Sequence, residues 1–223
     1  ESLKERMSGL EKYEAIDIIG CGSAYHVGLV GKSLITKYGN VPVYVDIASE
    51  YRYTEHIYSK KHLIILISQS GETADTLAVL RKAKEQGIDT LAIVNVVGSS
   101  IAREADKVLY IKAGPEIAVA TTKAYSCQLM MLSLIAMYLG IKKGNLGEGI
   151  LEQYDRLGSL IEEEIKDTKL IEKIAKKIYK KKDIFYLGRK IDYSLCMEAS
   201  LKLKEISYIH SEAYAAGELK HGT

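Results

Sequence analysis

The sequence has little cysteine and no long hydrophobic run, and each of these absences excludes a class of protein. Its three cysteines are an odd number and lie far apart, with no CxxC or Cys/His spacing, so neither a disulfide framework nor a zinc site is indicated. A reducing compartment, the cytoplasm, is therefore expected. The most hydrophobic run, residues 125–140, is shorter than the roughly 20 residues of a membrane helix and contains Gln128, which predicts a buried helix.

The sequence also has no excess of charge and no targeting signal. A net charge of +2 gives no reason to expect a nucleic-acid partner, and residues 1–17 are charged throughout, without the apolar core of a signal peptide. We therefore expect no contact with nucleic acid or membrane, and no metal or other cofactor is indicated. Because the chain begins with Glu1 instead of methionine and stops inside a motif, we expect it to be part of a longer protein.

What the sequence does contain is a regular alternation of two patterns. Short runs rich in valine and isoleucine are typical of buried parallel strands and occur at residues 15–20, 41–47, 62–68, 89–96 and 107–112. Helical periodicity lies between them, notably at residues 24–38, 73–86 and 122–139. The alternation predicts an α/β domain over residues 1–140, a doubly wound, flavodoxin-like, five-stranded parallel sheet with helices on both faces. In such a sheet, ligands bind beyond the carboxyl ends of the strands.

The pattern changes after residue 140. Residues 141–182 are predicted to form a helical connector, with helices over 148–165 and 168–181. The second helix has leucine and isoleucine at spacing four and a cluster of lysines, which predict an apolar stripe opposite a solvated basic face. A phosphate-binding or nucleic-acid-binding role for the lysines is the less favoured alternative.

Residues 183–223 resemble a second copy of the start of the chain. A shift of 168 residues places Gly20 on Gly188 and Tyr25 on Tyr193, so that a strand, a glycine turn and a long helix recur at equal spacing. This internal duplication predicts the truncated beginning of a second domain. About 40 residues are too few to bury a core of their own, so we expect this part to be completed by missing sequence or to lean on something else.

Hydroxyl side chains gather where three of the predicted strands end. The stretch LISQSGETADT presents Ser68, Gln69, Ser70 and Gly71 before a helix that begins near Thr73. GCGSAYH places Ser23 in a second glycine turn, and AGPEIAVATTKAY places Thr121 and Thr122 before a third helix. Free N–H groups and the helix dipole favour an anion at such positions, and Gly71 would let the backbone approach closely. The three turns therefore predict a converging pocket for a phosphorylated polyol.

Other interpretations of these turns stay open. No lysine follows the glycine, so this is not a Walker A loop, and the absence of GxGxxG argues against a dinucleotide fold. Ser70 or Thr73 could instead cap its helix, with the other polar side chains in water. Cys21 lies beside the predicted pocket, where a small buried side chain is the favoured interpretation.

The end of the chain contains groups that could move protons. Glu198, Lys202 and Glu205 stand at i, i+4 and i+7, so they share one helix face, and His221 follows in a glycine-flanked loop. A carboxylate, an amine and an imidazole near one pocket could act as acid and base, because histidine titrates near neutrality. The alternative is a surface stripe with a Glu–Lys pair worth about 0.2–0.5 kcal/mol.

Several long motifs resemble one known family. CGSAYH, IASEYRY, LISQSGETADT, EIAVATTKAY and LKLKEISYIHSEAYAAGELKHG are similar to the isomerase half of glucosamine-6-phosphate synthase, over essentially the whole chain. The resemblance implies two sugar isomerase (SIS) domains behind a glutaminase domain in a homodimer. It also implies that fructose 6-phosphate and glutamine-derived ammonia are converted to glucosamine 6-phosphate.

The same resemblance implies roles for individual residues. The expected contacts of the sugar phosphate are Ser68, Gln69, Ser70 and Thr73 for the phosphate, and Ser23, Val119, Thr121 and Glu198 for the rest of the substrate. Glu205 would move a proton between C1 and C2, with Lys202 in support. His221 would assist ring opening in the partner subunit's site.

The chain also departs from the family pattern. Ala24 and Thr121 stand where the family usually has serine, and Thr223 stands where it has proline. The family's C-terminal lysine, which forms a Schiff base with the ketose, is missing, so weak binding and little turnover are expected from this chain alone. Two alternatives remain: a sugar-phosphate sensor without catalysis, which the proton-shuttle residues argue against, and a deglycase or plain ketose–aldose isomerase.

Overall fold

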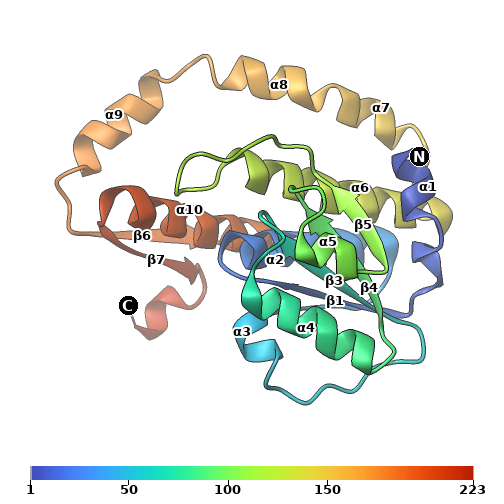
Figure 1. Ribbon diagram of the computed structural model, residues 1–223. Coiled ribbons are helices and arrows are strands. Elements are labelled where there is room, and N and C mark those ends of the chain that lie inside the picture. Colours follow the sequence, from blue (N-terminus) through green and yellow to red (C-terminus); the bar gives the residue numbers. More distant parts are fainter. Residues whose placement is uncertain (1, 223) are drawn as a thin grey trace.

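The computed structural model describes residues 2–222, so the interpretation of Thr223 lies outside the described residues. Its first lobe, residues 3–142, is a parallel sheet between two layers of helices (Figure 1). The strands are β1 (Ala15–Gly20), β2 (Val43–Ile47), β3 (His62–Ser68), β4 (Asp89–Val94) and β5 (Lys107–Tyr110). They pair in the order β2-β1-β3-β4-β5, all parallel. The predicted doubly wound, five-stranded α/β fold is confirmed.

Helices cover both faces of this sheet. One face carries α1 (Leu3–Met7), the short 3-10 helix η1 (Leu10–Lys12), α2 (Ser23–Gly39) and α6 (Lys123–Lys142). The other face carries α3 (Ala48–Tyr51), α4 (Ala74–Glu85) and α5 (Ser100–Glu104). The short helices α1, α3 and α5 were not predicted, because four or five residues are too few to show a helical period.

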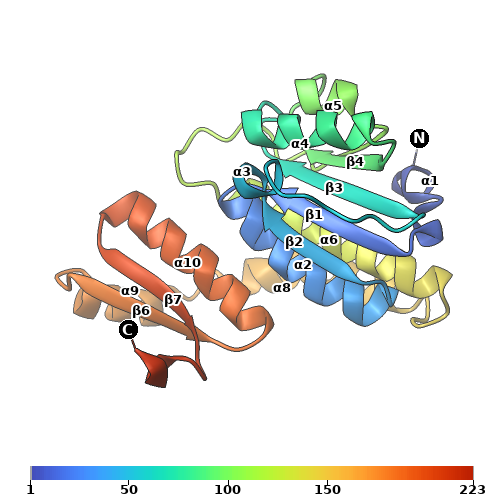
Figure 2. The same ribbon diagram turned by 90° about the horizontal axis from the view of Figure 1, so that it is seen from below.

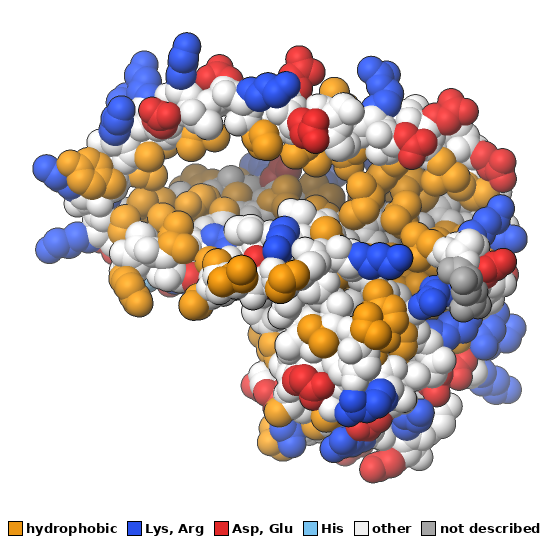
Figure 3. All heavy atoms as spheres, turned by 45° about the horizontal axis from the view of Figure 1, so that its top comes forward, with side chains coloured by type: hydrophobic (Ala, Val, Ile, Leu, Met, Phe, Trp, Pro, Cys, Tyr) orange, Lys and Arg blue, Asp and Glu red, His pale blue; other side chains and the backbone are white. Residues whose placement is uncertain are grey.

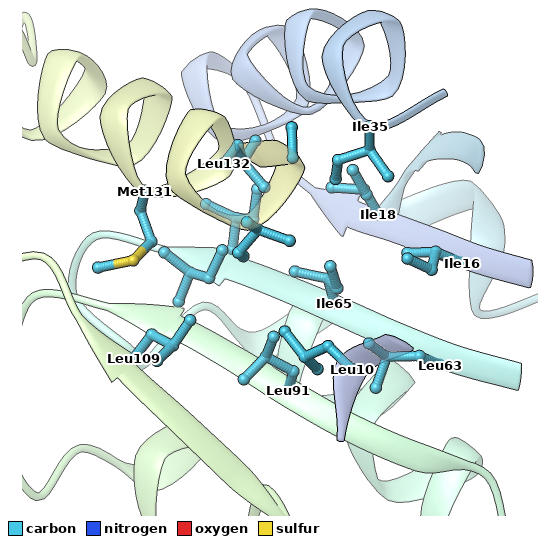
Figure 4. Packing of buried hydrophobic residues seen from close by; sticks show 14 of the residues in the cluster. Leu10, Ile16, Ile18, Ile35, Leu63, Ile65, Leu91, Leu109, Met131 and Leu132 are labelled. Atoms are coloured by element: carbon cyan, nitrogen blue, oxygen red, sulfur yellow. The ribbon is translucent and has the colours of Figure 1, made fainter. Parts of the chain in front are cut away.

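The central strand β3 shows why the strands are continuous apolar runs in the sequence. All seven of its residues are buried, and successive side chains alternate between the two cores. Leu63 and Ile65 face α2 and α6, while Ile64 and Leu66 face α4. Figure 4 shows the first of these cores, where the strand side chains meet Leu132 and its neighbours on α6. Each fully buried Leu or Ile contributes about 1.5–3 kcal/mol to the free energy of folding. The two cores therefore fix the position of β3 and of the turn that follows it.

Helix α6 forms from the most hydrophobic run of the chain. It has 20 residues, and among residues 2–222 it is the one helix long and apolar enough to cross a membrane by length and composition. Most of it is nevertheless buried inside the lobe, against α2 and the sheet. The predicted buried helix is therefore confirmed, and its apolar character is explained by core packing.

The connector is less regular than predicted. The helix expected over 148–165 is split into α7 (Ile150–Asp155) and α8 (Leu157–Glu164), and Arg156 lies between them. The second helix, α9 (Lys169–Ile178), has no buried residue. Figure 3 shows hydrophobic side chains along the side of this arm that faces the rest of the molecule, with charged side chains outside. The predicted apolar stripe exists, but within the described residues nothing covers it.

The second lobe, residues 183–221, repeats the start of the first. It consists of β6 (Asp183–Gly188), α10 (Ile191–Ser207), β7 (His210–Ala215) and the 3-10 helix η2 (Leu219–His221). The bounds of β6 and α10 equal those of β1 and α2 shifted by 168 residues at both ends. Ile184 pairs with Ser211 just as Ile16 pairs with Val43, at the same separation in sequence. Helix α10 packs against α2, so this lobe leans on the first (Figure 2).

Candidate functional site

A pocket of about 260 Å³ lies at the carboxyl ends of β1 and β3. These neighbouring strands are where the strand order reverses, the place at which open α/β sheets bind ligands. Ten residues line the pocket and none of them is charged: Cys21, Ser23, Ala24, Ile67, Ser68, Gln69, Ser70, Thr73, Thr121 and Gln128. Six of the eight predicted substrate contacts are thereby brought together from three separate turns.

The turn after β3 is organised by its own hydroxyl groups. The Ser68 hydroxyl oxygen accepts the Gly71 N–H at 3.0 Å and shares a second hydrogen bond of 2.8 Å with the Thr73 hydroxyl. The Ser70 oxygen accepts the Glu72 N–H at 3.2 Å. In these bonds, one hydroxyl hydrogen of the Ser68–Thr73 pair has no acceptor, and neither has the hydroxyl hydrogen of Ser70. The turn can therefore donate two hydrogen bonds to a ligand.

Gly71 has a packing role that was not predicted from the sequence. Its φ of +69° lies in the left-handed region, and a Cβ added there would come within 2.0 Å of the Ser99 hydroxyl oxygen. Ser99 precedes α5, which packs on α4. Glycine is therefore needed at this position so that the turn can pack against the β4–α5 connection. Close approach to a ligand is not required to explain it.

Two long helices point uncapped N-termini at the pocket. Helix α2 begins after Gly22 and α4 begins after Thr73, and neither of these N-cap residues makes a side-chain capping hydrogen bond. The alternative that Thr73 caps α4 is thus not observed. Free N–H groups and the helix dipoles make this end of the lobe electropositive without any cation, which suits a phosphate group.

The turn before α6 contributes less than expected. The Thr121 hydroxyl donates to Glu116 at 3.1 Å, and the same carboxylate accepts the Ala124 N–H at 3.1 Å. Glu116 therefore caps α6. Because the Thr121 hydroxyl already donates its hydrogen to Glu116, it cannot donate the same hydrogen to a ligand. Val119 is 93% exposed and does not line the pocket, so the structure does not bring this predicted contact to the site.

Four pocket residues had not been predicted as contacts: Ile67 at the end of β3, Gln128, Cys21 and Ala24. Gln128 is 2% exposed and reaches the pocket from α6, and its signal was a lone amide in the most hydrophobic run. Cys21 lines the pocket as a half-buried free thiol that also packs against the second core, so the small buried side chain that was favoured is only partly buried. Ala24 lines the wall where the family pattern has serine, and it packs within 2.8 Å of where a Cβ of Gly20 would be.

The predicted proton-transfer residues do form one connected group on α10. Lys202 lies between two carboxylates, with its Nζ 3.4 Å from Glu198 Oε1 and 2.5 Å from Glu205 Oε2. Glu198 is buried and its Oε2 lies 2.8 Å from Nδ1 of His26 on α2. Burial raises the pKa of Glu198, but hydrogen bonds from His26 and Ser23 outweigh it, and the pKa falls below its ordinary value. Glu198 therefore stays ionised and makes an interlobe contact.

His221 lies apart from this group. It ends η2 in the second lobe, is exposed, and lines no part of the pocket. Within residues 2–222, no three His, Cys, Asp or Glu side chains converge in a way that could hold a metal ion. The acid–base residues and the hydroxyl pocket thus lie on different elements, and α2 and α10 connect them.

A larger hollow, about 550 Å³, lies at the edge strand β2 and shares no lining residue with the pocket. Asp17 is the centre of its buried polar groups: His62 Nε2 lies 3.0 Å from Asp17 Oδ1, and the Tyr51 hydroxyl donates to Asp17 Oδ2 at 2.6 Å. Unlike the hydroxyl pocket, its lining includes the charged residues Lys32, Asp46 and Glu55 and none of the predicted substrate contacts. The hydroxyl pocket is therefore the candidate functional site.

Comparison with known proteins gives consistent matches. Two curated relatives named glutamine–fructose-6-phosphate aminotransferase (isomerizing) are each 54% identical, from Caldanaerobacter subterraneus over 96% of this chain and from Clostridium tetani over 100% of it. The chain spans only 36% and 37% of their respective lengths. The solved C-terminal domain of glucosamine-fructose-6-phosphate aminotransferase from Francisella tularensis is 42% identical, with a TM-score of 0.91 over 98% of this chain and 62% of that one.

The family match covers both lobes. The SIS domain family matches residues 9–138, which contain the sheet and the pocket, and residues 177–223, which contain the repeat. The two matched segments leave out most of the connector, whose helices are exposed. The chain belongs to the SIS domain family.

Proposed function

We propose that this chain is the isomerase portion of a glutamine–fructose-6-phosphate aminotransferase. In that enzyme it would bind fructose 6-phosphate, and the full protein would use ammonia from glutamine to form glucosamine 6-phosphate. The observation that carries the proposal is the uncharged pocket, where hydroxyls and two uncapped helix N-termini converge at the reversal of strand order. The names and high identity of the relatives support the choice of substrate.

The pocket binds the phosphate through neutral donors. Ser70 and one member of the Ser68–Thr73 pair donate their hydroxyl hydrogens, and the first N–H groups of α4 add to them. Gln69 and Gln128 supply amides to the wall, and Ser23 faces the sugar from α2. Because no lysine or arginine lines the pocket, the dianion is held by many weak bonds, which allows the product to leave.

The chemical step requires a base near C1 and C2 of the opened sugar. We assign this proton transfer to the carboxylate of Glu205, which has Lys202 directly beside it. General base catalysis of this kind raises a reaction rate by about 10²- to 10⁴-fold. His221 would open the sugar ring, and its exposed position fits a role in the partner subunit's site of a homodimer. A glutaminase domain elsewhere in the full protein would supply the ammonia. We place this enzyme in the cytoplasm.

The proposal is tested by heat stabilisation with fructose 6-phosphate. A ligand at 100 times its dissociation constant stabilises a protein by about 2.7 kcal/mol, and we expect Thr73→Val and Ser68→Ala to abolish most of that shift in melting temperature. Ser33→Ala, which removes an exposed hydroxyl from the middle of α2, serves as the matched control and should keep the full shift. Equal stabilisation of all variants, or equal stabilisation by fructose without the phosphate, would contradict the proposed site.

A further inference from the structure

One buried polar contact joins the two lobes. Nδ1 of His26, in the first turn of α2, lies 2.8 Å from Glu198 Oε2 on α10. Only 13% and 8% of these two side chains are exposed, so the pair is nearly dry. An unpaired carboxylate at such a position would cost several kcal/mol, and the His26 hydrogen bond is the first of the contacts, ahead of those from Ser23 and Lys202, that let Glu198 stay charged there.

The direction of the hydrogen bond follows from the charges around Glu198. Burial raises the pKa of Glu198, but the hydrogen bonds from His26 and Ser23 and the charge of Lys202 keep it below its ordinary value, so the carboxylate is ionised and can only accept. Nδ1 of His26 must therefore carry the proton and donate it. Besides Lys202, Tyr125 of α6 also faces Glu198, and burial together with the Glu198 charge raises the pKa of Tyr125 to about 12. Its hydroxyl makes no hydrogen bond within the described residues, so His26 is the ring donor to Glu198 in this structure.

The contact continues along α10 to the group assigned as the base. Lys202 Nζ is 3.4 Å from Glu198 Oε1 and 2.5 Å from Glu205 Oε2, so one ammonium group is shared between two carboxylates. How strongly the ammonium group is attracted to one carboxylate depends on how many other hydrogen bonds the second carboxylate already accepts. Because His26 satisfies one oxygen of Glu198, the ammonium group lies closer to Glu205.

We propose that His26 is a positioning residue for the isomerase reaction: by donating to Glu198 it sets the place of Lys202, and Lys202 holds the Glu205 carboxylate. This inference rests on the proposed function. It also connects the two parts of the site, because His26 lies one turn from Ser23, which lines the phosphate pocket. Without the His26 donor, Glu198 draws Lys202 toward itself and Glu205 is released to rotate.

The test uses the full-length protein that contains this chain and measures formation of glucosamine 6-phosphate. For His26→Leu we expect kcat to fall about 10- to 100-fold, since a misplacement near 1 Å costs about 10²-fold. KM for fructose 6-phosphate should stay within about twofold of the wild type, because the phosphate turn is untouched. His26→Asn should restore kcat, since the Asn amide donates from nearly the position of Nδ1.

His210→Leu is the matched control. Its Nδ1 also lies 3.0 Å from a carboxylate, that of Asp183, but the pair is exposed and joins β6 to β7, so kcat should not change. If His26→Leu does not fold, His26→Gln makes the same test, because its amide overlays Nε2 and not Nδ1. Unchanged kcat with a lower melting temperature, or failure of His26→Asn to restore kcat, would overturn the inference. A wild type that neither binds fructose 6-phosphate nor forms product would instead overturn the proposed function, and the inference with it.

Discussion

At the scale of single residues, the pocket depends on side chains that hold its backbone as much as on those that face a ligand. The Ser68 oxygen takes up the Gly71 N–H, and Gly71 in turn leaves room for Ser99. These contacts fix the direction of the hydroxyls before any ligand arrives. Pre-organised donors lose less conformational entropy on binding, which is how a pocket without cations can still bind an anion.

We expect Gly71→Ala to destabilise the first lobe by about 2–5 kcal/mol. A non-glycine residue in the left-handed region costs about 1–2 kcal/mol, and overpacking against Ser99 adds about 1–3 kcal/mol. Gly87→Ala is the matched control, because its φ is also +69° but nothing lies within 4 Å of its Cβ position. Urea unfolding measures both, and Gly71→Ala/Ser99→Gly should recover most of the difference. Equal losses at Gly71 and Gly87 would show that the contact with Ser99 is unimportant.

At the scale of elements, helices of similar composition differ in what they pack against. The connector helices α7, α8 and α9 have 6, 8 and 10 residues and bury none of them. Helices of this length are marginal in water without tertiary contacts. Their exposed apolar side chains, such as Leu170 and Ile174, therefore add no packing energy among the described residues.

Hydrogen exchange should separate the connector from the first lobe. We expect the backbone amides of α9 to exchange at rates within about 100-fold of an unfolded peptide, because little free energy opposes their opening. Helix α4 is the matched control, since its 12 residues include Thr76, Val79, Leu80 and Ala83 in buried positions. Its amides should exchange only with unfolding of the whole lobe. Similar protection of α4 and α9 would contradict this difference in stability.

At the scale of the whole molecule, the cores belong to one lobe. Every residue of the two hydrophobic clusters lies between Leu3 and Leu139, and no apolar side chain of residues 149–222 is buried. The second lobe is held by β6–β7 pairing and by the packing of α10 on α2. We therefore expect the second lobe to need the first lobe in order to fold, and the first lobe to fold without the second.

A truncated chain tests this dependence. We expect residues 1–148 to fold alone and to melt cooperatively, with a melting temperature within about 10 °C of the intact chain, because the packing of α10 on α2 is the largest contact that is lost. Residues 149–223 alone should show no cooperative transition by circular dichroism. A truncated first lobe without a melting transition would mean that α10 completes its core.

The amino-acid sequence by itself determined the fold class, the order of elements and the duplication. Apolar runs such as β3, and the recurrence of Gly20 at Gly188, are local patterns that do not depend on distant contacts. It also predicted that Ser23, Ser68 and Thr121 would converge, because parallel strands end at the same edge of a sheet.

Only the tertiary structure decided how those groups are used. It turned the hydroxyl of Thr121 toward Glu116, placed Gly71 against Ser99 and brought His26 to Glu198, a residue 172 positions away in the chain. Periodicity and spacing describe neighbours within one element. The partner of a polar side chain is chosen by the packing of different elements, and that packing depends on the shape of the whole lobe.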